Sequence, residues 1–157
     1  MDNFEKIFNR SLDFVNVGLS DIELYSREEI EDVQNEYRYL KRNGEKNKSW
    51  IGEEYVVIGI DTCCGDPIIA KVDDEKIPIY YMMHGISRSL ELISDSFDNF
   101  MKILELIESV NLLDFQEIEQ VLLKIQEIVP AIEVDKYWRV LLQTGYDFLI
   151  SEWVEWY

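Results

Sequence analysis

The spacing of hydrophobic residues predicts helices in the first quarter of the chain. Ile7 and Phe8 follow Phe4 by three and four positions, so the three residues fall on one face of a short helix. A second helix is expected after Ser26, because Ser26 and Glu29 have the spacing of a capping box. We expect that helix to end near Asn43-Gly44. Its hydrophobic positions at helical spacing are Ile30, Val33, Tyr37 and Leu40.

The middle of the chain has the composition and alternation of β-strands. The triplet Gly65-Asp66-Pro67 lies between two runs rich in β-branched residues. Glycine permits positive φ, aspartate accepts local backbone hydrogen bonds and proline fixes φ, so the triplet predicts a corner between strands. The run Asp73-Asp74-Glu75-Lys76 predicts a second turn. The expected strands are 55–60, 67–72, 77–83 (with Ile77, Ile79, Tyr81 and Met83 on one face) and 90–93.

The spacing becomes helical again from Ser94 to the end of the chain. Asp114 and Glu117 predict a helix start, and Pro130 predicts its end. The amphipathic stretch Leu149 to Tyr157 indicates a terminal helix docked on the core. The alternative is an exposed aromatic anchor for a partner, formed by Trp153 and Trp156. The inward positions expected in the two preceding helices are Phe97, Phe100, Met101, Leu104, Ile107, Phe115, Ile118, Leu122, Ile125 and Val129.

These elements predict an α+β fold, in which an antiparallel β-sheet of about four or more strands is flanked by helices and followed by a helical C-terminal extension. We expect a single domain over residues 1–157, with a core at about 20–108 and a helical part at about 114–157. A chain of 157 residues can bury roughly two-thirds of its unfolded surface. Hydrophobic residues make up 47% of it, which is too many for a disordered acidic segment.

Charge narrows the classes of partner. Lys and Arg total 15 against 32 Asp and Glu, which gives a formal net charge of −17 at pH 7. Nucleic acids and anionic membranes attract basic surfaces, so direct binding to either is not expected. Met1 to Lys6 has neither a basic leader nor a long apolar core, so a cytoplasmic location is expected. The alternative meaning of the acidity is solubility alone.

Few residues have the pattern of a catalytic or metal site. His84 is the only histidine and follows a predicted strand, where a structural imidazole is the simpler interpretation. Cys63 and Cys64 are adjacent, which disfavours both a structural disulfide and a zinc site. Asp61 and Asp66 could act as paired carboxylates only across a substrate cleft. We therefore expect no enzyme activity, no metal and no cofactor.

The order of several motifs resembles the SUKH superfamily, which contains the fungal Smi/Knr cell-wall assembly regulators and many small bacterial proteins. The matching segments run from about Trp50 to Leu104. They are Ile58-Gly59-Ile60-Asp61, Gly65-Asp66-Pro67-Ile68, Pro78-Ile79-Tyr80-Tyr81 with His84, and Ser96-Phe97 with Phe100. The resemblance implies an antiparallel sheet flanked by helices, with structural roles for Gly59, Gly65, Asp66, Pro67, Pro78, Tyr80, His84 and Phe97.

The resemblance also implies a function. Short bacterial members are similar to immunity proteins, which bind a cognate polymorphic toxin and neutralise it by occlusion. A nuclease toxin has a basic groove, and a protein of charge −17 complements it and speeds the encounter. The alternatives are a regulatory scaffold of the Smi/Knr type, or an enzyme or small-ligand binder using Asp66 and His84. The partner-binding residues expected are Asp61, Asp66, Asp73, Asp74 and Glu75.

Overall fold

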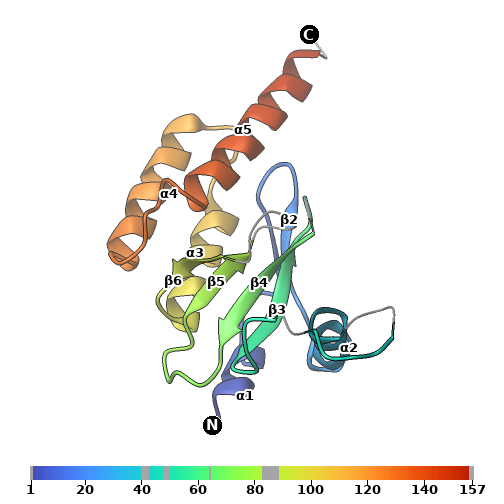
Figure 1. Cartoon of the computed structure of the whole chain (residues 1–157). Helices are drawn as coiled ribbons and strands as arrows, with labels where there is room; N and C mark the ends of the chain where they lie inside the picture. The colour runs from blue at the N-terminus through green and yellow to red at the C-terminus, as the bar shows by residue number, and fades with distance from the viewer. Residues whose placement is uncertain (1, 40–42, 48–49, 64, 83–88, 156–157) are drawn as a thin grey trace.

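In the residues that it describes, the computed structural model has a six-stranded antiparallel sheet and five helices in one α+β domain (Figure 1). It describes residues 2–39, 43–47, 50–63, 65–82 and 89–155. For residues 153–155 it describes the backbone alone. The strands lie in the sheet in chain order. The elements are α1 (Asn3–Phe8), β1 (Phe14–Asn16), β2 (Asp21–Leu24), α2 (Arg27–Arg38), β3 (Tyr55–Asp61), β4 (Asp66–Lys71), β5 (Ile79–Met82), β6 (Leu90–Ser94), α3 (Phe97–Ser109), α4 (Phe115–Ile128) and α5 (Trp138–Glu155).

Turn chemistry decides how the central strands join. Gly65 has φ +75°, a conformation that glycine adopts without steric cost, and its N–H donates to the carbonyl oxygen of Asp61 at 3.0 Å. The predicted corner is therefore confirmed at Gly65, whereas Asp66 and Pro67 already belong to β4, where they pair with Asp61 and Ile60. The strand after the second turn begins at Ile79 rather than Ile77. Ile77 has φ +55° and donates its N–H to Asp74 O at 3.0 Å, so it belongs to the turn.

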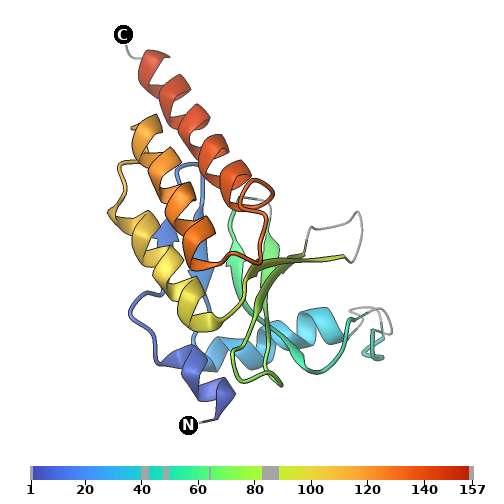
Figure 2. The same cartoon turned by 90° about the vertical axis from the view of Figure 1, so that its left-hand side faces the viewer.

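The helices α3, α4 and α5 form a layer on one face of the sheet (Figures 1 and 2). Phe100 on α3 and Trp138 at the start of α5 are fully buried, with ring centroids 6.3 Å apart. The Trp138 indole N–H donates to Ile93 O in β6 at 2.9 Å, which ties α5 to the sheet. The predicted inward positions of α3 are all buried. Phe115 is the exception in α4, because it is 44% exposed.

The helix α2 closes an open edge of β3. The Gln34 side chain accepts from the Val57 N–H at 2.9 Å and donates to the Val57 carbonyl oxygen at 2.8 Å, as a neighbouring strand would. The capping box of Ser26 and Glu29 at the start of α2 is confirmed. The helix ends at Arg38, because Tyr39 is extended; the predicted end near Asn43-Gly44 was wrong.

Two short strands and most of α5 were not expected from the sequence. The strands β1 and β2 extend the sheet beyond the predicted strands, and β1 lies before residue 20, the predicted start of the core. The helix α5 begins at Trp138 and buries Leu142 and Gly145, whereas the amphipathic stretch was expected to begin at Leu149. A side chain at Gly145 would collide with Val17 O, so glycine permits this close approach. The side chains of Trp153 and Trp156 lie outside the described residues.

Candidate functional site

Two aspartates lie opposite each other where β3 and β4 meet the corner. Asp61 and Asp66 are cross-strand partners, and both side chains are on the helix-covered face, with 7% and 3% of their surface exposed. Like charges directly opposite in a strand pair destabilise a sheet by about 0.2–1 kcal/mol. The two carboxylates lie side by side on the same face of the sheet, and they do not face each other across a cleft. The arrangement expected of paired glycosidase carboxylates is therefore not present.

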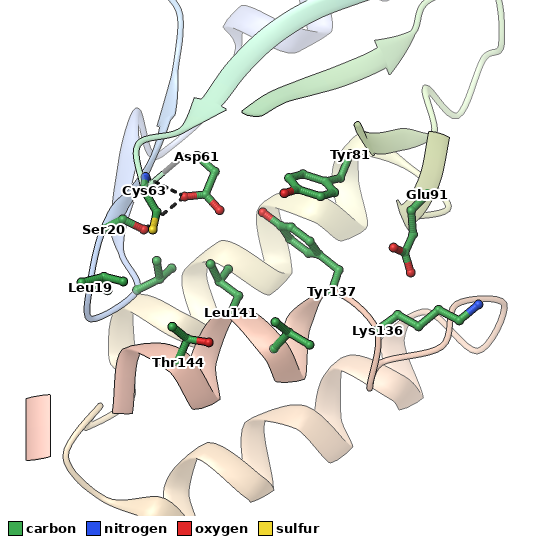
Figure 3. A pocket seen from close by; sticks show the side chains of 12 residues that line it. Leu19, Ser20, Asp61, Cys63, Tyr81, Glu91, Lys136, Tyr137, Leu141 and Thr144 are labelled. Atoms are coloured by element: carbon green, nitrogen blue, oxygen red, sulfur yellow. Dashed lines mark hydrogen bonds between the residues drawn. The ribbon is translucent and has the colours of Figure 1, made fainter. Parts of the chain in front are cut away.

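Hydrogen bonds hold one oxygen of Asp61 in place. Asp61 Oδ1 accepts from Ser20 Oγ and from the Cys63 N–H, both at 3.1 Å. Burial raises the pKa of Asp61, and the charge of Asp66 adds to this, while the two hydrogen bonds act in the opposite direction. The second oxygen, Oδ2, accepts no hydrogen bond from the described residues, and it lies on the side of the Tyr137 hydroxyl (Figure 3).

Two tyrosines lie beside the carboxylates. The Tyr81 hydroxyl donates to Asp66, and the rings of Tyr81 and Tyr137 are 4.6 Å apart between centroids. Tyr137 is 7% exposed, and its buried hydroxyl has no hydrogen-bond partner among the described residues. Burial raises the pKa of Tyr137 far above its ordinary value, with smaller contributions from Asp61, Tyr81 and Asp66, so its proton stays on the oxygen. A buried polar group left without a partner is rare.

Asp61, Tyr81 and Tyr137 border a cavity of about 220 Å³ between the sheet and α5 (Figure 3). Its walls combine polar groups of the sheet with aliphatic side chains of the 17–20 loop and α5. The Lys136 ammonium is 3.1 Å from Glu133 Oε2 in an exposed ion pair. The lining residues are Val17, Leu19, Ser20, Asp61, Cys63, Tyr81, Glu91, Lys136, Tyr137, Val140, Leu141 and Thr144.

The other predicted binding residues are at the opposite end of β4. Asp73, Asp74 and Glu75 are exposed in the turn between β4 and β5. Lys71 Nζ is 3.7 Å from Asp73 Oδ1, and the Asn3 side chain donates to Asp74 O at 3.0 Å. The structure thus does not bring the five predicted acidic residues together.

Asp61 and Asp66 were predicted to bind the partner, but they do not display their charge on the surface. Both side chains are buried, because each belongs to the helix-covered face of its strand. Only the turn at Asp73, Asp74 and Glu75 displays its charge as expected.

The residues that carry the family resemblance occupy structural positions. Gly59 lies against Glu23 O in β2, where a side chain would collide with it. Pro67 and Pro78 are buried, and Phe97 is buried at the start of α3. Tyr80 packs edge-on against Tyr55, with centroids 5.9 Å apart. His84 and Cys64 lie outside the described residues, so the proposed pairing of Asp66 with His84 stays a prediction.

Sequence reasoning did not find Ser20, Tyr81 and Tyr137 as residues of the site. Tyr81 was assigned only to one face of a predicted strand and to a segment of the family resemblance, and Tyr137 lies between two predicted helices. The one available signal was polar or amphipathic residues at the ends of elements, where clefts form. Their meeting depends on how α5 packs against the sheet, which periodicity does not specify.

A metal site and a membrane-spanning helix are both absent from the described part of the chain. No group of three or more His, Cys, Asp or Glu residues there could hold a metal ion. No helix in those residues is long and apolar enough to cross a membrane.

Comparisons with protein-family models, with curated proteins and with solved structures each found no match. The resemblance to the SUKH superfamily therefore stays a prediction.

Proposed function

We propose that this chain is an immunity-type protein, which binds a basic toxin domain, such as a nuclease, and neutralises it by occlusion without chemistry of its own. The observation that carries the proposal is the cavity bordered by Asp61, with Asp66 directly behind it. A recess bordered by a buried carboxylate favours a positively charged group from a partner.

The energetic cost of this arrangement supports a binding role. A buried carboxylate loses hydration, and Asp61 also lies opposite a second carboxylate. An apolar pair at these positions would spare the sheet that cost. Sites that break a local rule of stability are often functional sites, because the cost is recovered on binding.

The net charge of −17 supports the same partner class. A strongly acidic protein attracts a basic surface over distances up to about the Debye length, roughly 8 Å at physiological salt. This attraction raises the association rate, while close contacts at the cavity set the dissociation rate. The acidic turn at 73–75 contributes to the association rate, and the cavity contributes to the dissociation rate.

Co-expression with the toxin domains encoded next to this chain tests the proposal. We expect at least one of them to be toxic alone, to be neutralised by this chain, and to co-purify with it. The double variant Asp61→Asn/Asp66→Asn should lose neutralisation, whereas Asp73→Asn/Asp74→Asn, which changes the net charge equally, should retain it. Failure of the parent chain to bind or neutralise any neighbouring toxin would contradict the proposal.

A further inference from the structure

We propose that the cavity between the sheet and α5 receives the guanidinium group of an arginine side chain from the bound partner. This inference rests on the proposed function, because it assigns the contact through which the basic partner is held. The parts of the argument are the charge of the cavity, its unused hydrogen-bond acceptors, the shape of its walls and its apolar rim.

The charged side chains of the cavity favour a cation. Asp61 and Glu91 line it, and Asp66 lies behind Asp61. Among the described residues that line it, the only cation is Lys136, and its ammonium is paired with Glu133 at 3.1 Å. The balance is negative, and the low dielectric of a partly buried site strengthens its attraction for a positive group.

Two acceptor atoms beside the cavity lack a donor among the described residues. Asp61 Oδ2 accepts nothing from the described residues, since Ser20 and Cys63 both donate to Oδ1. The Tyr137 hydroxyl oxygen has no partner there either. The two atoms lie on facing sides of the same space (Figure 3). A planar group with several donors in a fixed fork can bond to both.

The walls suit the rest of an arginine side chain. The ring of Tyr137 lies beside that of Tyr81, and a guanidinium stacks well on such faces. Val17 and Leu141 provide aliphatic surface for the methylene stem. A lysine ammonium fits less well, because it is compact and strongly hydrated and has no planar face to stack.

The rim of the cavity favours a protein as the source of this group. Leu19 and Val140, which line the cavity, are 40% and 58% exposed. A free small cation would leave these apolar side chains in water, whereas a protein surface around an inserted arginine would cover them. Charged or aromatic anchors surrounded by a ring that excludes water are typical of protein interfaces.

The test uses acetyl-arginine amide as the probe and acetyl-citrulline amide as its uncharged counterpart. Chemical-shift titration of the full chain should show saturable binding of the arginine compound at millimolar concentration, with shifts at Tyr81, Tyr137 and Thr144. The citrulline compound should bind at least tenfold more weakly. Asp61→Asn should weaken arginine binding at least tenfold, while the charge-matched Asp74→Asn should leave it unchanged.

Tyr137→Phe provides a second variant that removes one oxygen and preserves the packing of the ring. It should weaken arginine binding several-fold and leave the fold intact by circular dichroism. Equal binding of arginine and citrulline compounds, or no effect of both Asp61→Asn and Tyr137→Phe, would overturn the inference. Agmatine binding more than tenfold tighter than acetyl-arginine amide would also overturn it, because it would identify a free cation as the ligand.

The neutralisation assay separates this inference from the proposed function. A toxin that is bound and neutralised equally by the parent, Asp61→Asn and Tyr137→Phe would leave the immunity function standing and remove the arginine contact. Arginine-probe binding by a chain that neutralises no neighbouring toxin would support the contact and contradict the immunity function.

Discussion

The two ends of β4 carry acidic groups of the same formal charge in opposite surroundings. At one end, Asp66 and its cross-strand neighbour Asp61 are buried and accept hydrogen bonds from Tyr81, Ser20 and the Cys63 backbone. At the other end, the turn 73–75 is exposed to solvent. Desolvation sets the energy of a carboxylate more than its formal charge does. The buried pair is therefore costly to the fold, and only that pair can gain much from a cation.

The largest change in this contrast is expected from displacing α5, which covers the buried pair. A side chain at Gly145 would collide with Val17 O, so we expect Gly145→Val to lower the free energy of unfolding by about 3 kcal/mol. Urea denaturation measures this. Thr144→Val, at the neighbouring exposed position, is the control and should change stability by less than about 0.5 kcal/mol. A Gly145→Val protein as stable as the parent would show that this close approach does not hold α5 against the sheet.

A smaller loss is expected from truncating one member of the buried pair. Asp66→Ala leaves the Tyr81 hydroxyl without this acceptor, at a cost of about 2 kcal/mol in the free energy of unfolding. Asp74→Ala removes the same charge from the exposed turn and should cost less than about 0.5 kcal/mol. Thermal and urea unfolding of both variants give the comparison. Equal effects at the two positions would mean that burial does not distinguish them.

Local chemistry predicted more of the fold than of the site. The capping box at Ser26 and the turn at Gly65 depend on neighbours within four residues, and both are as expected. The apolar spacing of α3 likewise identified its buried face. The strand β1, with three residues, is too short to show an alternation, and α5 has a glycine in its buried face, which breaks the apolar stripe.

The site depends on contacts between segments that are far apart in the chain. Ser20 donates a hydrogen bond to Asp61, which is 41 residues away in the chain. Trp138 donates one to Ile93, 45 residues away, and this contact places the adjacent Tyr137 against Tyr81. Neither contact has a signature in the spacing of residues. The sequence identified Asp61 and Asp66 as candidates from their position at a corner, but it did not show that they are buried, because that depends on which face of the sheet the helices cover.

Neutralising one buried carboxylate should stabilise the protein by a modest amount. Asp61→Asn keeps the oxygen that accepts from Ser20 and the Cys63 N–H and removes the like charge opposite Asp66. We expect about 0.5–1 kcal/mol of added stability at pH 7. An exposed charge in the turn offers no such gain, so Asp73→Asn is the control. A loss of stability in Asp61→Asn at pH 7 would contradict this account.

The pH dependence of this gain gives a sharper test. The pKa of Asp61 is raised in the folded state, so the folded protein holds the Asp61 proton to higher pH than the unfolded chain does. The stabilising effect of that proton is complete below the ordinary aspartate pKa of about 3.9 and is lost as pH rises through the raised value. The advantage of Asp61→Asn over the parent should therefore be smallest near pH 3.5 and reach its plateau above the raised pKa, as urea midpoints across pH 3.5–8 would show.

The smallest effect on the fold is expected from replacing Asp73, Asp74 and Glu75 with Ser, because exposed groups contribute little to stability. The free energy of unfolding should change by less than about 0.5 kcal/mol. In complex with a neutralised toxin, the triple variant should associate more slowly at low salt, by less than about tenfold, with a weaker salt dependence and an unchanged dissociation rate. Stopped-flow measurements at several salt concentrations separate the two rates. Faster dissociation, as expected for Asp61→Asn, would mean that the turn also forms close contacts with the partner, and the two ends of β4 would then share one role.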